Sequence, residues 1–522
     1  MLFSSFVFIF LFLPLALAGF YLARKAGRVW SMWVLTLASI GFYAYWLPKQ
    51  TWILLVSIVF NYIVGHYIQQ HRDDRPTLTK WILIFGLTCD LGALFYFKYT
   101  MFVLDNLNAF AGADFVIPHI ILPLGISFFT FQKIAYLVDC SRGEAKKTTL
   151  SEFALFASFF PQLIAGPIVH HKEIIPQFRN DLFGRFQSSN FLVGVSIFSM
   201  GLFKKTVIAD SIAAFFIPMY KAAAATDGHV DMRTGWLIAL GWTLQVYFDF
   251  SGYSDMAIGL ARMCGVQLPL NFHSPLRASG VIDYWRRWHM SLQRFILAYV
   301  FQPLSMPLNR LAVRRKIKGW SGFVVTVVIP SFITFFLLGV WHGAGWNFVV
   351  FGLLNAMYVS VNEAYREMLR RRRRARQKAG KPVAPEGVGM KIFHHVVTLA
   401  CVGTGNVFFR AESLTDGVNI FKGMWGFNGF ALNPALSQFA NATFLALLTL
   451  GVLIVAFLPN TQQIMRNYRP AVNWRQWRTV GIAPIRWVWR PEPLKLAFIA
   501  AALFLGVEFI QRGETIFVYF NF

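Results

Sequence analysis

The chain has 522 residues, of which 56% are hydrophobic and 14% are charged, and its mean hydropathy is +0.50. A soluble domain carries about 25% charged residues, so this composition excludes an ordinary soluble protein and indicates a chain embedded in lipid. The net charge of +25 on its own suggests nucleic-acid binding, but the long apolar segments favour a membrane protein with basic cytoplasmic loops. The cysteines are scattered without metal-ligand spacing, so we expect neither a metal site nor disulfides: Cys89, Cys140, Cys264 and Cys401.

Apolar segments of bilayer-spanning length recur along the whole chain. The first of them, Met1–Phe20, has no basic region before its apolar run, and Arg24 and Lys25 follow it. That order favours a retained first span over a signal peptide, with the N-terminus outside. The sequence predicts about twelve spans, near residues 3–21, 30–47, 51–70, 79–104, 119–138, 190–218, 234–263, 321–341, 345–365, 391–409, 441–458 and 494–512.

The loops between these segments alternate in charge. With the N-terminus outside, the loops on the cytoplasmic side are all basic: 24–28, 71–80, 142–147, 172–185, 314–318, 366–381 and 466–490. The opposite loops carry almost no Lys or Arg: 105–118, 219–231 and 411–440. Because positive loops stay in the cytoplasm, this pattern predicts that both termini lie outside.

Two segments interrupt the simple pattern of spans. Residues 151–168 are apolar but contain Pro161 and Gly166, and residues 279–310 are amphipathic, with several Arg among Trp and Leu. We interpret both as re-entrant segments, which require burial in protein or a wet cavity at membrane depth. No soluble domain and no clear internal repeat are visible, so residues 1–522 are interpreted as one integral-membrane domain.

Two histidines occupy polar motifs within this apolar chain. His342 ends an apolar run in Val340–Asn347, and His289 follows an aromatic, basic run in Asp283–Leu292. An ionisable group at membrane depth is costly and usually functional, and imidazole exchanges protons near neutral pH. The alternatives are a hydrogen-bonded interfacial histidine at 342 and a headgroup-level histidine at 289. At His342 the setting favours a site, because Gly343 and Gly345 leave room for a substrate and the indoles of Trp341 and Trp346 form an apolar wall.

Three further motifs have open interpretations. Asp249 and Asp255 are more consistent with pairing to an arginine such as Arg286 or Arg287, or with capping a helix, than with direct chemistry. The stretch Pro123–Gln132 either lines a cavity or forms a proline-kinked packed helix. The run Arg370–Arg374 is interpreted as a signal that fixes the cytoplasmic side, and contact with anionic lipid headgroups is the alternative.

The chain resembles the membrane-bound O-acyltransferase (MBOAT) family, and within it the bacterial alginate O-acetyltransferase membrane subunit and its relatives. The resemblance runs from the first span to the terminal Tyr519–Phe522. It rests on the stretches 123–132, 160–167, 247–255, 271–275, 283–292, 341–347 and 408–412. It implies an all-α polytopic membrane protein, a helical bundle with re-entrant segments around a central tunnel. In this family the histidine of the WHG motif is catalytic and the histidine after WRRW is functional, which here are His342 and His289.

The resemblance also implies the reaction. A cytoplasmic thioester, acetyl-CoA or another acyl thioester, donates acetyl through the tunnel, with no tightly bound cofactor. Arg286 and Arg287 suit donor phosphates, although they suit Asp249, Asp255 or lipid equally. Charge places His289 on the cytoplasmic side, to act on the donor, and His342 on the outer half, as the base for the acceptor hydroxyl. We expect further substrate contacts from Trp341, Trp346, Asn347, Trp285, Tyr253, Ser127 and Gln132.

The acceptor is expected to be an extracytoplasmic polysaccharide, first an alginate-like exopolysaccharide. Peptidoglycan, cellulose and teichoic acid are the alternatives within the family. The resemblance further implies a bacterial inner-membrane location with periplasmic termini, membrane lipids as partners and no nucleic acid. An extracytoplasmic acetyltransferase subunit is the expected protein partner, with residues 411–440 as a docking loop. A channel or polysaccharide exporter is a different class, and it is disfavoured because the polar residues cluster at two histidine motifs.

Overall fold

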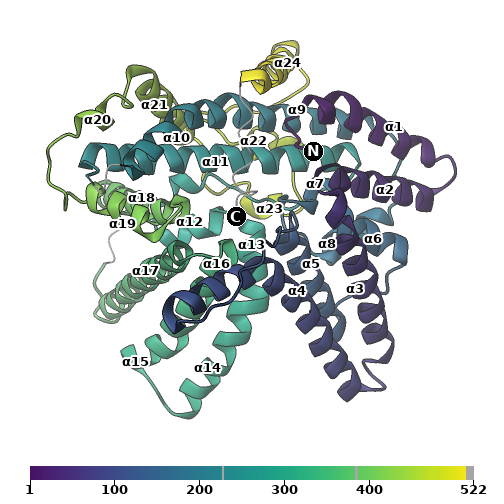
Figure 1. Cartoon of the computed structure of the whole chain (residues 1–522), viewed down its shortest axis with the longest axis horizontal. Helices are drawn as coiled ribbons and strands as arrows, with labels where there is room; N and C mark the ends of the chain where they lie inside the picture. Colours follow the sequence, from purple (N-terminus) through teal and green to yellow (C-terminus); the bar gives the residue numbers. More distant parts are fainter. Residues whose placement is uncertain (226–228, 383–385, 513–522) are drawn as a thin grey trace.

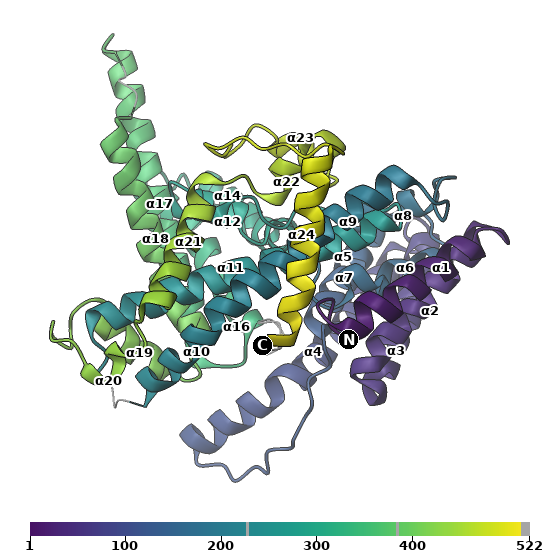
Figure 2. The ribbon, with the colours of Figure 1, turned by 90° about the horizontal axis from the view of Figure 1, so that it is seen from above.

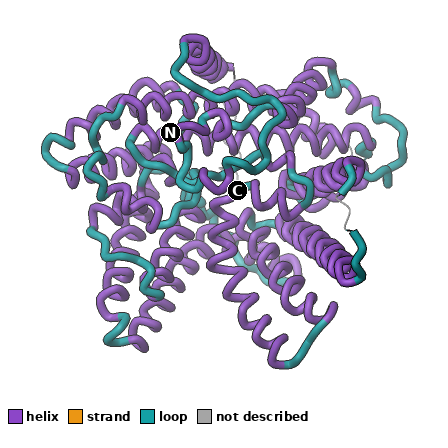
Figure 3. Tube along the Cα trace, turned by 180° about the vertical axis from the view of Figure 1, so that it is seen from behind, coloured by secondary structure: helices purple, strands orange, loops and turns teal. Residues whose placement is uncertain are grey.

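The computed structural model describes residues 1–225, 229–382 and 386–512. All regular secondary structure within these ranges is helical, and they contain no strand (Figure 3). The predicted all-α class is therefore confirmed. The motif Tyr519–Phe522 lies outside the described residues.

The helices, with η marking short π- or 3₁₀-helical turns, follow one another along the chain. The N-terminal half contains η1 (Val7–Phe12), α1 (Leu13–Ala23), α2 (Arg28–Trp46), η2 (Pro48–Gln50), α3 (Thr51–His71), α4 (Pro76–Ala111), α5 (Ile126–Ser141), α6 (Leu150–Ser158), α7 (Phe160–Leu163), α8 (His171–Phe178), α9 (Ser188–Phe203), η3 (Lys204–Ala209), α10 (Asp210–Ala224) and α11 (Met232–Met263). The C-terminal half contains η4 (Pro275–Arg277), α12 (Val281–Arg287), α13 (Met290–Ile296), η5 (Leu297–Phe301), α14 (Gln302–Arg314), α15 (Gly319–Phe323), η6 (Val324–Val328), α16 (Ile329–His342), α17 (Trp346–Lys378), α18 (Val388–Arg410), α19 (Leu414–Met424), α20 (Pro434–Ser437), α21 (Ala442–Phe457), α22 (Thr461–Ile464), η7 (Arg466–Tyr468), α23 (Trp474–Trp477), α24 (Pro493–Glu508) and η8 (Phe509–Arg512).

Helix α11 is the centre of the bundle. Every residue from Gly241 to Ala261 is buried, so this part of the helix is enclosed on all sides. Figure 1 shows α9, α10 and α11 running along the long axis of the molecule, with α3, α14 and α17 projecting below them.

Glycines allow α9 and α11 to pack backbone against backbone. A Cβ added at Gly201 would lie 2.6 Å from the carbonyl oxygen of Gly252, and one at Gly252 would lie 2.7 Å from that of Gly201. About two helical turns away, Gly194 and Gly259 form the same reciprocal contact. Small residues at such positions are how helices approach closely in lipid, where no hydrophobic force drives them together.

The two carboxylates of α11 are paired with lysines of η3. Asp249 lies 2.9 Å from the ammonium of Lys205, and Asp255 lies 2.6 Å from that of Lys204. Asp255 also accepts hydrogen bonds from Thr461 and Gln462. The predicted structural role is therefore confirmed, but the partners expected at 286 and 287 were wrong. The lysines prevail because η3 continues α9, which the glycines hold directly against α11.

The polytopic prediction is confirmed, and the structure places a helix at each of the twelve expected segments. In the described ranges six helices are long and apolar enough to cross a bilayer: Pro48–His71, Pro76–Ala111, Ser188–Ala224, Gly319–His342, Val388–Arg410 and Pro493–Gln511. Two shorter apolar helices are Val7–Ala23 and Ala442–Phe457. The segment expected at 119–138 was wrong at its start, because α5 begins only at Ile126. Pro123 and the left-handed Gly125 (φ 72°) precede it and do not continue a helix.

Both segments predicted to be re-entrant consist of broken helices. Residues 151–169 are buried throughout, and α6 and α7 are separated at Phe159. Residues 279–310 contain α12 and α13, which are separated at Trp288 and His289. Irregular backbone at membrane depth requires this kind of enclosure by protein. The number of spans and their orientation remain predictions.

The orientation predicts a labelling experiment. Arg371 on α17 and Ala431 before α20 are both exposed, and the charge pattern places them on opposite sides of the membrane. Single cysteines at these positions, in a background without native cysteines, are treated on intact cells with a thiol reagent that does not cross the inner membrane. We expect labelling at 431 and protection at 371, with lysed cells as the control for reactivity. The reverse pattern would overturn the orientation.

Candidate active site

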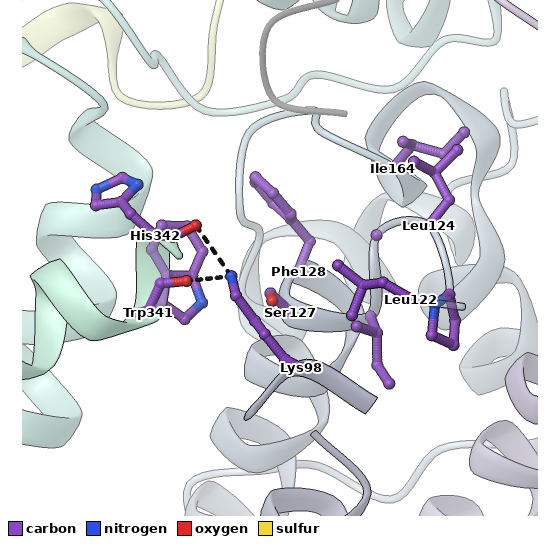
Figure 4. Close-up of a pocket in the computed structure, with 11 residues that line it drawn as sticks. Lys98, Leu122, Leu124, Ser127, Phe128, Ile164, Trp341 and His342 are labelled. Carbon is purple, nitrogen blue, oxygen red and sulfur yellow. Dashed lines mark hydrogen bonds between the residues drawn. The ribbon is translucent and has the colours of Figure 1, made fainter. Parts of the chain in front are cut away.

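His342 is the last residue of α16, and two side chains of α4 cap the end of that helix. The ammonium of Lys98 donates to the carbonyl oxygens of Trp341 and His342, the latter at 3.1 Å, and the hydroxyl of Tyr99 donates to that of Val340 at 3.0 Å. Figure 4 shows Lys98 between the two carbonyls. The last carbonyls of a helix lack intrahelical partners and carry partial negative charge, which explains why a lysine suits this position. Helix α4 thereby fixes the position of the histidine.

The imidazole of His342 sits in an aromatic enclosure. It is 4% exposed, and its ring centroid lies 4.8 Å from Trp341, 5.0 Å from Phe409 and 5.7 Å from Phe351. The ring points away from Lys98 (Figure 4). Such a setting excludes bulk water from a reacting group.

The expectation that Gly343 and Gly345 leave room for a substrate was wrong. A Cβ added at Gly343 would lie 2.1 Å from the ring of Phe348, and one at Gly345 would lie 2.4 Å from the side-chain oxygen of Asn347. The glycines instead let α17 turn back tightly against α16, so the space beside them is filled by protein.

The indole of Trp341 joins the two histidines into one site. Its ring lies 4.8 Å from His342 and 6.4 Å from His289, and it stacks on Phe131 at 5.3 Å. The two histidines, which were predicted to act on different halves of the membrane, thus share one indole, and their depth in the bilayer remains a prediction. Residues 279–310 carry charges that suggest the cytoplasmic side, yet their broken helices bring His289 inward to the end of α16.

His289 is oriented by Asn271. The Nδ1 atom of His289 lies 3.0 Å from the side-chain oxygen of Asn271, which also accepts from the hydroxyl of Ser291 at 2.8 Å. Because this oxygen only accepts, Nδ1 carries the hydrogen in the neutral ring, and Nε2 is then the basic nitrogen. The residue has a left-handed backbone (φ 44°), which is unusual for a side chain this large. The backbone bonds from Met290 to Asn271 and from His273 to Arg287 maintain it.

Three cavities lie in series around His342. The first encloses about 80 Å³ and is lined by Lys98, residues 122–128 and Trp341. The second encloses about 20 Å³ between Trp285, Phe351 and Phe409, and His342 is the residue that it shares with the first. The third, about 690 Å³, adjoins the second at Trp285. The linings of the first two cavities share only His342, and those of the last two share only Trp285, so the expected continuous tunnel remains a prediction.

The structure brings some of the other predicted contact residues to these chambers. Ser127 lines the first, and Trp285 lines the second and third, where its indole nitrogen donates to Asn355 at 3.1 Å. Arg286 is exposed on the wall of the third chamber, whereas Arg287 is buried and paired with Asp283 at 2.9 Å.

Four predicted contact residues lie elsewhere. Trp346 is 49% exposed and donates to Asn106 of α4, and Asn347 donates to the carbonyl of Ala411 at 2.8 Å. Tyr253 stacks on Phe3 at 4.8 Å, and Gln132 is buried in α5 outside the residues that line the chambers. The described ranges contain no group of three His, Cys, Asp or Glu side chains that could hold a metal ion.

Comparison with known proteins shows the family. Residues 126–385 match the membrane-bound O-acyltransferase family, MBOAT. The peptidoglycan O-acetyltransferase of Helicobacter pylori is 36% identical over 84% of this chain and 83% of its own length. A probable alginate O-acetylase of Pseudomonas aeruginosa is 35% identical over 88% of this chain and 80% of its own.

The chain belongs to the membrane-bound O-acyltransferases. A more distant relative, the teichoic acid D-alanyltransferase of Streptococcus thermophilus, is 27% identical over 53% of this chain and 66% of its own. The predicted enzyme class, a membrane O-acetyltransferase with several membrane-spanning helices, is therefore confirmed.

Sequence reasoning missed several residues around this MBOAT site. Lys98 is the clearest example, since it is, like Asp90, an ionisable residue inside the predicted span 79–104. Asn271 was noticed within a motif but given no role. Phe409 likewise lay within a motif, 408–412, without an assigned role, whereas Phe351 lacks any such signal, because aromatic residues are abundant in every span of this chain.

Removal of the Lys98 ammonium is expected to misplace His342. Lys98→Met should lower kcat by about 10- to 100-fold, since errors near 1 Å in a reacting group can cost about 10²-fold. The donor KM should change less, because Lys98 is remote from the third chamber. Lys98→Arg should restore part of the activity, and Tyr99→Phe should have a smaller effect. If Lys98→Met also lowered the thermal unfolding temperature markedly, and Lys98→Arg restored no activity, the loss of kcat would reflect unfolding, which would contradict a positioning role.

Proposed function

We propose that this enzyme transfers an acetyl group from a cytoplasmic thioester to hydroxyls of an extracytoplasmic polysaccharide, with His342 as catalytic base. The observation that carries the proposal is the position of His342 between two chambers. We expect a donor from the side of the third chamber and an acceptor from the side of the first to meet at His342, the residue that the first two chambers share.

The chemistry requires one proton to move twice. The imidazole of His342 takes the proton of the acceptor hydroxyl as the oxygen attacks the thioester carbonyl carbon. The carbon–sulfur bond then breaks, and the imidazolium returns the proton to the departing thiolate. A positioned histidine contributes about 10²- to 10⁴-fold to such a step. The aromatic enclosure excludes water, which would otherwise hydrolyse the donor.

The third chamber suits the thioester donor, either acetyl-CoA or another acyl thioester. Arg286 is exposed on its wall, while Arg294 is paired with Glu173 and Arg370 with Glu363. Guanidinium groups match phosphate geometry, so Arg286 is the residue that we assign to the phosphates of the donor. Arg287 is held by Asp283 and has a structural role.

The acceptor assignment rests on the relatives. Their names specify alginate and peptidoglycan, and we place an alginate-like exopolysaccharide first and peptidoglycan second. The loop 411–440 remains the proposed docking site for an extracytoplasmic acetyltransferase subunit. We place the enzyme in the bacterial inner membrane, with both termini in the periplasm.

A channel or exporter requires a continuous path, whereas here Trp285 and the enclosure of His342 divide the chambers. The experiment that tests the proposal uses the purified protein with acetyl-labelled CoA in detergent. We expect slow release of labelled acetate or acetyl transfer to an added oligosaccharide. Transport of the oligosaccharide across liposomes without acetyl turnover would favour the exporter.

His289 is expected to act on the donor. The next residue, Met290, lines the third chamber, and the His289 ring packs on Trp341. His289→Ala should raise the donor KM more than it lowers kcat, since a lost binding contact has that signature. Calorimetric donor titration and single-turnover rates measure the two effects separately. Unchanged donor affinity together with lost turnover would instead assign His289 to the chemical step.

A further inference from the structure

A small cavity lined by three arginines lies outside the histidine site. It is a half-open surface pocket, and its lining includes the exposed Arg466, Arg478 and Arg486 beside Trp474 and Trp487. No acidic side chain lines it. Among residues 1–225, 229–382 and 386–512, the ion pairs include none of these three arginines. Three like charges therefore face one small space without a protein counter-charge.

The segment that carries these arginines is held in a fixed shape. Within it, the amide of Trp489 donates to the carbonyl of Ile464 at 2.8 Å, and Gln463 donates to that of Gly481 at 2.8 Å. Bonds to the rest of the protein also hold it: Val472 to Leu268 at 3.1 Å, Leu270 to Asn473 at 3.0 Å and His273 to Val480 at 2.7 Å. The cavity is thus part of the folded structure, and a ligand need not order a loose loop.

The cavity lies where α24 enters its apolar stretch. The indole of Trp487 packs on Phe498 of α24 with centroids 4.9 Å apart, and Pro493–Gln511 is a candidate span. Two further lining residues, Ile482 and Ile485, are exposed apolar side chains. Figure 2 shows α22 and α23 beside this end of α24. Arginine, tryptophan and exposed isoleucine together are typical of the membrane interface.

We propose that this arginine pocket, defined by Arg466, Arg478 and Arg486, binds a phosphate group of an anionic membrane phospholipid. Guanidinium groups form charge-assisted hydrogen bonds to phosphate oxygens, and the apolar lining suits the adjoining glycerol and acyl chain. A phosphate of the thioester donor has the same chemistry. The donor is a second possible source of the phosphate because the pocket is close to the third chamber. Trp474 lines the pocket, and Gln476 and Trp477 of the same short helix, α23, line the third chamber.

The test compares two triple variants with equal change of charge. The pocket variant is Arg466→Gln, Arg478→Gln and Arg486→Gln. The control is Arg469→Gln, Arg475→Gln and Arg490→Gln, which alters arginines of the same segment that are exposed like those of the pocket but do not line it. Native mass spectrometry of the purified full chain measures binding of phosphatidylglycerol in one arm and of CoA in the other. Thermal unfolding confirms that each variant is folded, and the single Arg478→Gln variant replaces the pocket triple if that one is not.

We expect the affinity for phosphatidylglycerol to fall on the order of tenfold or more in the pocket variant, and to stay near the parent value in the control. If the pocket variant lost affinity for CoA but not for phosphatidylglycerol, the pocket would be a phosphate site for the thioester donor, and the assignment to a phospholipid would be overturned. Equal losses in both triples would show unspecific charge attraction and overturn the proposal. Unchanged binding of both ligands in the pocket variant would overturn it as well.

Discussion

Replacement of His342 by alanine is expected to abolish acetyl transfer while the protein still folds and inserts. The loss should be at least about 10²- to 10⁴-fold, the usual contribution of a positioned base. The donor should still bind, because the third chamber is separated from His342 by the second. Polymer acetylation in a deletion strain and single-turnover rates of the purified variant measure the effect.

Two further variants separate chemistry from packing. His342→Gln keeps much of the side-chain volume without a base of similar strength, so it should be as inactive as the alanine variant. His171→Gln removes another buried imidazole, on α8, that lines none of the three chambers, and it should retain activity. Substantial acetylation by either His342 variant would remove this residue from the chemical step.

Enlarging the glycine contact between α9 and α11 is expected to have the largest effect on stability. In Gly252→Leu the new Cβ would lie 2.7 Å from the carbonyl of Gly201 and 3.0 Å from the amide of Lys205. The helices must separate, which loosens the ion pairs of Asp249 and Asp255 with η3. Overpacking alone costs about 1–3 kcal/mol, and disrupting a buried ion pair costs about 3–5 kcal/mol. Little folded protein should be recovered.

Gly92→Leu is the matched control for this change. Gly92 is also within a long helix, α4, but a Cβ there meets no atom within 4 Å. Its thermal unfolding in detergent, followed by size-exclusion chromatography, should match that of the parent. A Gly252→Leu protein as stable as Gly92→Leu would contradict the close contact of α9 with α11.

The parts of the fold that follow from local chemistry were predictable. Apolar length and loop charge located the helices, and the cost of intramembrane charge drew attention to His342 and His289. Pairing across the bundle was not predictable. Asp249 and Asp255 pair with Lys205 and Lys204 because glycine contacts set the register of α9 on α11, and no local rule reports that register.

The site illustrates the same limit. Charge alone separated the two histidines, because a charged segment is expected near the surface. The structure unites them because Asn271 and the backbone around His289 hold that broken segment against Trp341. The glycines after His342 were likewise interpreted as space for a substrate, although Phe348 occupies that space.

The complete burial of residues 151–169 has a consequence for biosynthesis. The amide of Phe160 donates to the hydroxyl of Ser39, which the ribosome has synthesised before this segment. The amide of Ile168 donates to the hydroxyl of Ser291, which is synthesised 123 residues later. At about 5–20 residues per second, the segment waits roughly 6 to 25 seconds for this partner. During that interval its broken backbone cannot be released into lipid, where unsatisfied peptide groups are costly. We therefore expect this segment to stay beside the membrane insertion machinery until α13 has been made.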